Sequence, residues 1–313
     1  MSLPFLQSYL GLSNSLQTAQ GGASPIIDPT RGVFAGGYTT VTSNVMDYIT
    51  IATTGNATDF GDLTVARYSL AGVNSSTRGV FGGGYTNVAS NVMDYITIAT
   101  TGNAVDFGDL TVARDHLAGL NSSTRGVFGG GSTGSDSNVM DYITIATTGN
   151  ATDFGDLSLT RRQVGGLNSS TRGVFGGGIT ADYLNTIDYI TIATTGNATD
   201  FGDLTVARSE PGGVNSSTRG VWSGGSKTVG DQNTIDYITI ATTGNATDFG
   251  DHSVSRVQIG AVCSSTRGVF GGGYVGGASD IIDYITIATT GNAVDFGDLT
   301  VARRLVPGIQ NGL

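Results

Sequence analysis

The sequence predicts an all-β fold, a six-bladed β-propeller with four antiparallel strands in each blade. Three observations support this prediction. One segment recurs six times at an almost constant spacing, each repeat contains four short stretches with the composition of strands, and the last residues are similar to the first strand of a repeat. The composition agrees, because 50 of the 313 residues are glycine and only 13% are charged, which is typical of short strands joined by tight turns.

The repeat is clearest in the segment TRGVFGGG and its close variants, which begin at residues 30, 77, 124, 171, 218 and 266. The spacing is therefore 47 residues four times and then 48. A period of 40 to 50 residues with four strands is typical of a propeller blade. We therefore assign residues 30–313 to the propeller and treat residues 1–29, which lie outside the repeat, as a separate segment.

Four strands follow one another within a unit such as 67–114. The stretches 70–74 (LAGVN) and 78–83 (RGVFGG) are joined by the turn NSST, and a variable loop leads to 91–100 (NVMDYITIAT). The turn TTGN then leads to 103–110 (NAVDFGDL). Branched and aromatic residues favour strands, whereas Gly, Asn and Ser favour the turns between them.

The end of the chain predicts how the ring closes. The segment ARRLVPGIQNGL aligns with ARYSLAGVNSS, the first strand of a unit, but no second strand follows it. The first unit lacks that strand, because it begins at its second one. We therefore expect residues 305–311 to form the innermost strand of the first blade.

Charge and composition exclude several classes of function. The net charge is −10, and Lys227 is the only lysine, so the chain is not expected to bind nucleic acid. Cys263 is the only cysteine, which excludes an internal disulfide. No stretch is apolar and long enough for membrane insertion, and the N-terminus does not resemble a signal peptide. We expect synthesis in the cytoplasm and interpret residues 1–29 as a tether to a larger assembly, or alternatively as a strap packed on the propeller.

The repeat divides the loops between two faces. NSST and TTGN are almost unchanged and lie on one face, whereas the second-to-third and fourth-to-first loops differ between units and lie on the other. Because variable residues on a rigid scaffold can build a specific surface, we expect ligands on the variable face. Tyrosines with polar neighbours suit sugars or a polar protein surface. The candidates are Tyr38, Tyr68, Tyr85, His116, Arg162, Tyr183, Glu210, Lys227, Tyr274 and Arg304. The alternative is that this variation is tolerated or serves subunit contacts.

Repeated charges are expected to be structural. Each inner strand is preceded by an arginine: Arg67, Arg114, Arg161, Arg208, Arg256 and Arg303. We expect each to form a bidentate pair with the last aspartate of a DFGD segment, which would link neighbouring blades. These aspartates are Asp62, Asp109, Asp156, Asp203, Asp251 and Asp298. Alternatively, the arginines ring the channel mouth and hold an anionic ligand.

No catalytic residues, metal site or cofactor site is predicted. His116 and His252 occupy different positions of different repeats, and Cys263 replaces an asparagine of NSST. DFG recurs in all six units without the glycine-rich loop, lysine and HRD of a kinase. We therefore expect a non-enzymatic protein. A carboxylate-based glycan hydrolase stays open as an alternative, and it would need a deep axial pocket with two acidic residues outside the repeat pattern.

These units resemble kelch propeller repeats. The resemblance rests on Arg67, the small inner strand LAGVN, the glycine pair of GVFGGG, Tyr95 and Phe107, which stands where kelch units usually carry Trp. The wording of the repeat is also similar to glycine-rich propeller proteins of marine bacteriophages of the cyanophage type, in which variants of VTIATTGNAxDFGDLTVAR recur. This resemblance implies a virion protein, displayed on a tail or capsid, that meets host-surface glycan or protein. The alternative is a cellular kelch-like interaction module.

Overall fold

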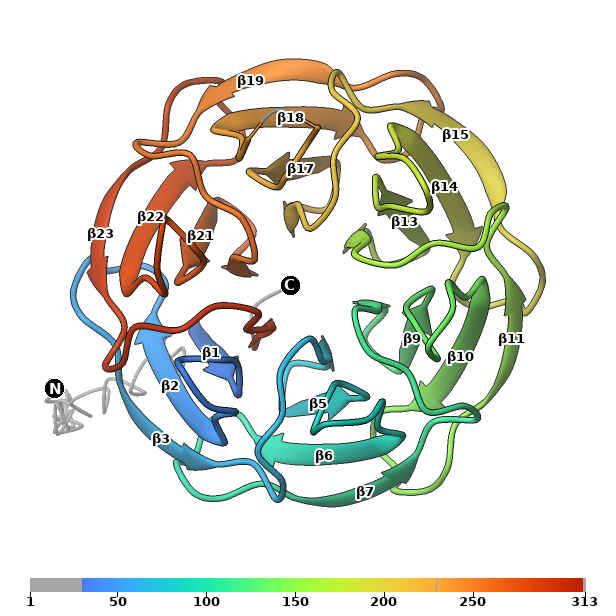
Figure 1. Ribbon diagram of the computed structural model, residues 1–313, viewed down its shortest axis with the longest axis vertical. Helices are drawn as coiled ribbons and strands as arrows, with labels where there is room; N and C mark the ends of the chain where they lie inside the picture. Colours follow the sequence, from blue (N-terminus) through green and yellow to red (C-terminus); the bar gives the residue numbers. More distant parts are fainter. Residues whose placement is uncertain (1–29, 229, 312–313) are drawn as a thin grey trace, which may run out of the picture.

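The computed structural model of the protein describes residues 30–228 and 230–311, and it confirms the all-β propeller. Six four-stranded antiparallel sheets surround one axis, and the described residues contain no helix (Figure 1). The tether expected at residues 1–29 lies outside the described residues.

In each blade, successive strands lie progressively farther from the axis (Figure 1). Blade 1 contains β24 (Gly308–Gln310), β1 (Arg31–Ala35), β2 (Val45–Thr50) and β3 (Thr58–Asp62). Blade 2 contains β4 (Ala71–Asn74), β5 (Arg78–Gly82), β6 (Val92–Thr97) and β7 (Val105–Asp109), and blade 3 contains β8 (Ala118–Asn121), β9 (Arg125–Gly129), β10 (Val139–Thr144) and β11 (Thr152–Asp156). Blade 4 contains β12 (Gly165–Asn168), β13 (Arg172–Gly176), β14 (Thr186–Thr191) and β15 (Thr199–Asp203). Blade 5 contains β16 (Gly212–Asn215), β17 (Arg219–Ser223), β18 (Thr234–Thr239) and β19 (Thr247–Asp251), and blade 6 contains β20 (Gly260–Cys263), β21 (Arg267–Gly271), β22 (Ile281–Thr286) and β23 (Val294–Asp298).

The hydrophobic core lies between blades. Val33 and Phe60 of blade 1 pack with Phe81 and Ile96 of blade 2, and each of these side chains is at most 3% exposed. Equivalent clusters fill the other five junctions, with Trp222 in place of phenylalanine at one of them. A single blade could not bury both faces of its sheet, so the ring is stable only as a whole.

A second arginine of each repeat strengthens the junction at its outer part. The Arg78 guanidinium lies 4.4 Å from the centroid of the Tyr95 ring and donates to the carbonyl of Ile145 in blade 3, at 3.1 Å. Tyr95 in turn packs edge-on against Phe107, with ring centroids 6.1 Å apart. The cation–π contact and the hydrogen bond therefore join one blade to the next.

The DFGD segment forms the outermost strand and contacts the following blade. The Asp62 N–H donates to Asn103 Oδ1 at 3.0 Å, and the Ala104 N–H donates to the Asp62 carbonyl at 2.8 Å. Gly61 has a φ of +137°, and a Cβ there would lie 2.5 Å from the carbonyl oxygen of Gly102. Only glycine allows this close approach, so the repeated DFG triplet has a structural explanation.

The C-terminal strand closes the ring, as predicted. β24 pairs antiparallel with β1, with Val33 opposite Ile309. The strand begins at Gly308 rather than 305, because Pro307 has no N–H to donate and contributes only its carbonyl, which accepts from the Ala35 N–H at 3.2 Å. Ile309 is fully buried against Gly79 of blade 2. Gly308 lies against Ala261 of blade 6, so the last strand contacts both blades that neighbour blade 1.

Truncating this closing side chain should destabilise the whole propeller. We expect Ile309→Ala to lower the free energy of unfolding by about 2–5 kcal/mol, because it leaves a cavity that rigid neighbouring strands cannot fill. Urea unfolding followed by circular dichroism measures this change. Val41→Ala, at a side chain that is 66% exposed, is the control and should have little effect. Equal stability of the two variants would contradict the closing role of β24.

Candidate functional site

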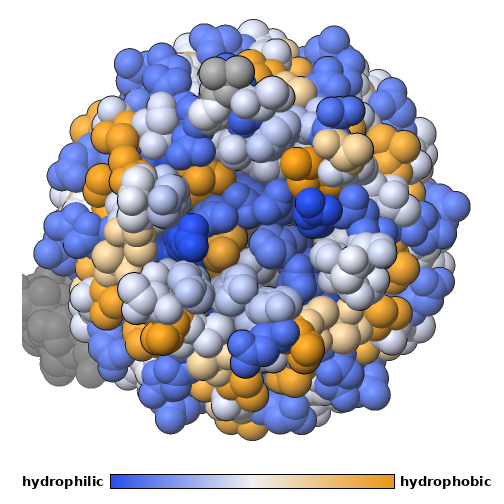
Figure 2. Space-filling view, in the orientation of Figure 1, coloured by the Kyte–Doolittle hydropathy of each residue, from blue (hydrophilic) through white to orange (hydrophobic). Residues whose placement is uncertain are grey.

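The propeller axis opens on two faces. The constant face carries the first-to-second and third-to-fourth turns, such as 74–77 and 100–103, and the variable face carries the other two kinds of loop. Figures 1 and 2 look along the axis onto the variable face, where connections from outer strands cross towards the centre. In Figure 2 this face is hollowed at its centre, and hydrophilic residues surround the hollow.

Six fully buried arginines anchor the connections between blades: Arg67, Arg114, Arg161, Arg208, Arg256 and Arg303. Arg67, in the connection from blade 1 to blade 2, places Nη2 2.9 Å from Oδ2 of Asp94 in β6. Asp94 also accepts a hydrogen bond from the Thr64 hydroxyl in the same connection. Burial raises the pKa of Asp94, against the opposing effect of the nearby Arg67 charge. The pair fixes where the chain enters each blade.

The sequence prediction of the aspartate partners is wrong. The arginines pair with the aspartate of the third strand: Asp94, Asp141, Asp188, Asp236, Asp283 and, for Arg303, Asp47. The predicted partners Asp62, Asp109, Asp156, Asp203, Asp251 and Asp298 instead end the outermost strands, where their backbone atoms bind the next blade. Each arginine reaches one carboxylate oxygen, so the predicted bidentate geometry is also wrong. Complete burial equally contradicts the alternative that these arginines hold an anion.

The axial mouth of the variable face is formed by one residue from each connection. We call these residues the axial ring, and they are Ser69, His116, Gln163, Glu210, Gln258 and Leu305. All six have left-handed backbone conformations, with φ between 53° and 63°. Five backbone hydrogen bonds of 2.7–3.2 Å pass from one ring residue to the next, for example from the His116 N–H to the Ser69 carbonyl. These bonds compensate for the unfavourable φ and hold the ring in place.

The side chains of the axial ring form a polar network around a cavity of about 110 Å³. Glu210 Oε1 accepts from Gln163 Nε2 at 2.8 Å and from Gln258 Nε2 at 3.4 Å, and it lies 3.9 Å from His116 Nε2. Burial raises the pKa of Glu210. On the other side, His116 Nε2 is 3.0 Å from Ser69 Oγ. The mouth therefore offers hydrogen-bond donors and acceptors together.

A wider groove of about 470 Å³ adjoins this mouth and shares His116 with it. Tyr68 and Tyr85 form one wall, and Asp115, whose Oδ1 is 2.6 Å from His116 Nδ1, belongs to the same lining. Arg162, which also lines the groove, is held by an ion pair with Asp136. Aromatic rings beside a carboxylate and an imidazole suit a ligand with both apolar and hydroxyl-rich surfaces.

Four tyrosines from three blades lie close together beside this groove, and we call Tyr38, Tyr68, Tyr85 and Tyr274 the tyrosine belt. Tyr68 packs against Tyr38 and Tyr85, with ring centroids 5.3 Å and 5.4 Å away. The Arg304 guanidinium lies 5.2 Å from the centroid of Tyr38 and 5.0 Å from that of Tyr274. Five of the predicted binding residues are thus brought together across blades 6, 1 and 2.

Two predicted binding residues lie elsewhere on the variable face. Tyr183 is in blade 4, with its hydroxyl 3.5 Å from Ser226 Oγ of blade 5, and Lys227 follows Ser226 in the loop of blade 5. Neither belongs to the three blades that carry the belt.

Sequence reasoning found only His116 and Glu210 of the six residues of the axial ring. Ser69, Gln163, Gln258 and Leu305 were not selected, although each is the middle residue of the variable triplet after a conserved repeat arginine. Comparing this one position across the six aligned repeats would have found them, because equivalent positions of successive blades meet at the axis.

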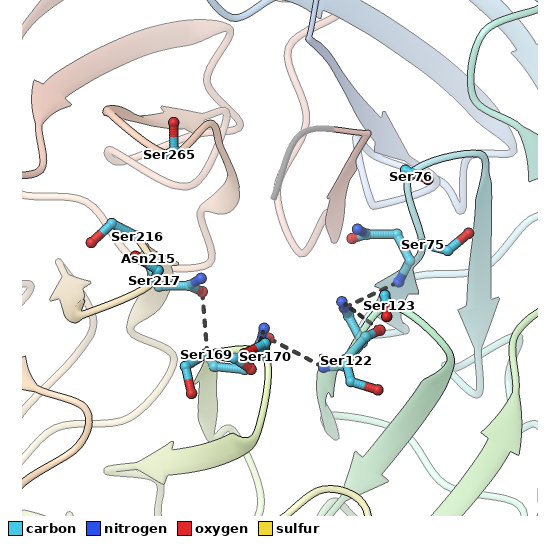
Figure 3. A pocket seen from close by; sticks show the side chains of 13 residues that line it. Ser75, Ser76, Ser122, Ser123, Ser169, Ser170, Asn215, Ser216, Ser217 and Ser265 are labelled. Atoms are coloured by element: carbon cyan, nitrogen blue, oxygen red, sulfur yellow. Dashed lines mark hydrogen bonds between the residues drawn. The ribbon is translucent and has the colours of Figure 1, made fainter.

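The mouth on the constant face has a cavity of about 210 Å³ and a different construction. The Asn74 N–H donates to Asn121 Oδ1, and the Asn121 N–H donates to Asn168 Oδ1, both at 3.1 Å. Figure 3 shows these links between blades and the serines around the mouth. Cys263 occupies the asparagine position in blade 6, where its Sγ is 3.4 Å from the Asn215 nitrogen, and burial raises the pKa of its thiol to about 12. This mouth is a neutral ring that joins neighbouring blades.

Blade 5 replaces an apolar contact by a buried polar one. Ser223 stands where four other blades have glycine and blade 1 has Ala35, and His252 stands where all the other blades have leucine. Ser223 Oγ contacts His252 Nε2. His252 Nδ1 lies 3.4 Å from Asp283 Oδ2. Burial lowers the pKa of His252, because the charged imidazolium would lose its hydration.

No protein-family model matches this chain, and a search of the curated proteins found no match. Within the described residues, no cluster of three or more His, Cys, Asp or Glu side chains could hold a metal ion. In the same part of the chain, no helix has the length and apolar character to cross a membrane. The fold defines the protein as a six-bladed β-propeller.

Backbone N–H groups donate to asparagine side chains from blade to blade at the constant mouth, and we call these bonds the asparagine ladder. Restoring the asparagine that Cys263 replaces should stabilise the protein. We expect Cys263→Asn to raise the free energy of unfolding by about 1 kcal/mol, because an amide oxygen accepts the Asn215 N–H better than a thiol does. Thermal unfolding monitored by calorimetry should show a melting temperature a few degrees higher. Cys263→Ala, which removes the weak acceptor, should move it in the opposite direction, and a lower melting temperature for the asparagine variant would contradict the ladder's role.

The buried histidine should make stability depend on pH. Its pKa is lowered in the folded state, so its contribution is complete above the unfolded pKa of about 6.5 and declines as the pH falls below it. We expect the double variant Ser223→Gly/His252→Leu, which introduces the residues found in blades 2, 3, 4 and 6, to lose less stability than the wild type between about pH 7 and pH 5. Urea midpoints across this range measure the difference. Parallel pH curves for the two proteins would show that His252 is not the responsible group.

Proposed function

We propose that the protein is a kelch-like binding propeller of a bacteriophage virion, on a tail or capsid appendage, whose variable face contacts glycan or protein on the host surface. The observation that carries this proposal is the tyrosine belt beside the polar axial mouth. Both are built from residues that differ between blades, whereas the blades themselves are held by repeated buried contacts. A rigid scaffold with a localised variable surface is the usual design of a recognition module.

The chemistry of the belt supports a sugar-like ligand. Tyr68 and Tyr85 supply flat apolar surfaces, and their hydroxyls, Asp115 and the axial amides supply hydrogen-bond partners close by. Pyranose rings present both an apolar face and a rim of hydroxyls, so they match such a surface. Binding of this kind needs no chemical step.

The virion assignment is supported by the amino-acid sequence of the repeat, which is similar to that of marine bacteriophage propeller proteins. On this proposal the chain is made in the host cytoplasm and displayed on the virion surface. Residues 1–29 would dock with other virion proteins and leave the variable face turned outwards. Nucleic acid is not a partner under this proposal, because the net charge is −10.

Removing two rings of the belt should weaken recognition. We expect the intact protein to bind a subset of glycans on an array, and Tyr68→Ala/Tyr85→Ala to bind them at least about tenfold more weakly. Tyr183→Ala is the matched control, because this tyrosine lies on the same face but outside the belt. Melting curves should show that all three proteins are folded.

The outcomes separate the parts of the proposal. Equal binding by the double variant would place the ligand outside the belt. Binding to no glycan would contradict the glycan form of the proposal and turn the test to host-surface proteins.

A further inference from the structure

Three groups at the axial mouth have the connectivity of a nucleophilic triad. Ser69 Oγ is 3.0 Å from His116 Nε2, and His116 Nδ1 is 2.6 Å from Asp115 Oδ1. Ser69 is 6% exposed, and the side chains of Asp115 and His116 are 9% and 21% exposed. In such an array the imidazole takes the hydroxyl proton through one nitrogen, while the carboxylate holds the other nitrogen and fixes the tautomer.

The backbone beside Ser69 supplies a hydrogen-bond donor for a negatively charged oxygen. Leu70 lies directly before β4, and its N–H donates to no backbone carbonyl among residues 30–228 and 230–311. The residue after the nucleophile is also the usual source of an oxyanion-binding N–H.

We propose that the axial mouth hydrolyses carboxylic esters of short acids, with Ser69 as nucleophile, His116 as general base and acid, and Asp115 as its positioning residue. This activity goes beyond the proposed binding function and does not depend on it. Ser69 Oγ bonds to the acyl carbon while its proton passes to His116 Nε2, and the Leu70 N–H binds the developing oxyanion.

The second half of the reaction uses the same groups. Collapse of the intermediate breaks the ester C–O bond, and the leaving alkoxide takes the proton from His116. Water then loses a proton to His116 and adds to the acyl carbon. Collapse of this second intermediate breaks the bond between the acyl carbon and Ser69 Oγ and releases the acid, and His116 returns its proton to Oγ, which restores the Ser69 hydroxyl. Glu210, 3.9 Å from His116 Nε2, favours the transient imidazolium when it is ionised.

The size of the site limits the substrate. The axial cavity of about 110 Å³ is smaller than a typical ligand pocket and is walled by Leu70, Leu117 and Val164, so it suits an acyl group of a few atoms such as acetyl. The groove that shares His116 is larger and holds the tyrosines, so it suits the alcohol part of the ester.

A similar set of side chains in the core shows that a triad also needs access for its substrate. This set is Ser223, His252 and Asp283. They have related contacts, but these side chains are at most 1% exposed between blades, so no substrate can reach them. They are a comparison within the same chain for the triad at the axial mouth.

Labelling of the intact protein with a fluorophosphonate probe tests the proposal. We expect one probe per chain, mapped by mass spectrometry to Ser69, and saturable hydrolysis of p-nitrophenyl acetate. Ser69→Ala should abolish labelling, and His116→Gln should slow labelling and hydrolysis by about 100-fold or more. Ser135→Ala, at an exposed serine of the same face, is the control and should change neither.

A second variant guards against loss of folding. Ser69→Cys keeps a nucleophile of similar size, and we expect iodoacetamide to alkylate position 69 rapidly while the buried Cys263, with a thiol pKa of about 12, stays unmodified. The proposal is overturned if natively folded protein is labelled nowhere or at another residue, or if Ser69→Ala hydrolyses the ester as fast as the wild type.

Discussion

The buried arginine–aspartate pair at each junction is the contact on which the rest of the molecule depends. Arg67 binds Asp94 and the Phe81 carbonyl, so it fixes the chain at the point where it enters a new blade. Ser69 follows two residues later, and its left-handed conformation turns the chain at the axis. An ion pair inside a protein contributes little net stability by itself, but it strongly penalises any other arrangement of the chain around it. The position of the axial mouth therefore follows from contacts buried in the blade junctions.

This arrangement separates the residues that fold the protein from those that meet a ligand. The aromatic and branched residues between blades, the Arg78–Tyr95 contacts and the glycines of the outer strands repeat around the ring. The residues at the axis and in the tyrosine belt instead vary between blades, although Tyr38, Tyr85 and Tyr274 occupy the same position of three blades. A change such as serine for histidine at a ring position alters the chemistry of the mouth while the backbone hydrogen bonds that hold it can stay the same.

The fold could be predicted from the sequence because a repeated segment with four strands leaves few alternatives, and the similarity between 305–311 and an inner strand showed how the ring closes. The arginine partner could not be predicted in the same way. Asp62 and Asp94 occupy two different positions of the repeat, and both positions carry aspartate in every unit. The spacing alone therefore does not show which aspartate pairs with the arginine. The contact between Ser69 and His116 was missed because it joins residues 47 apart, which only rotation about the axis brings together.

The axial ring has a consequence for how such a protein can diversify. The chemistry of the mouth is set by six tripeptides, one per blade, each anchored by an arginine before it and an inner strand after it. Exchange of tripeptides between blades, or recombination between near-identical repeats, would permute the groups around the mouth while every anchor stays in place. The propeller therefore has six equivalent positions for a variable tripeptide, and new combinations of these tripeptides give new surfaces on the same fold.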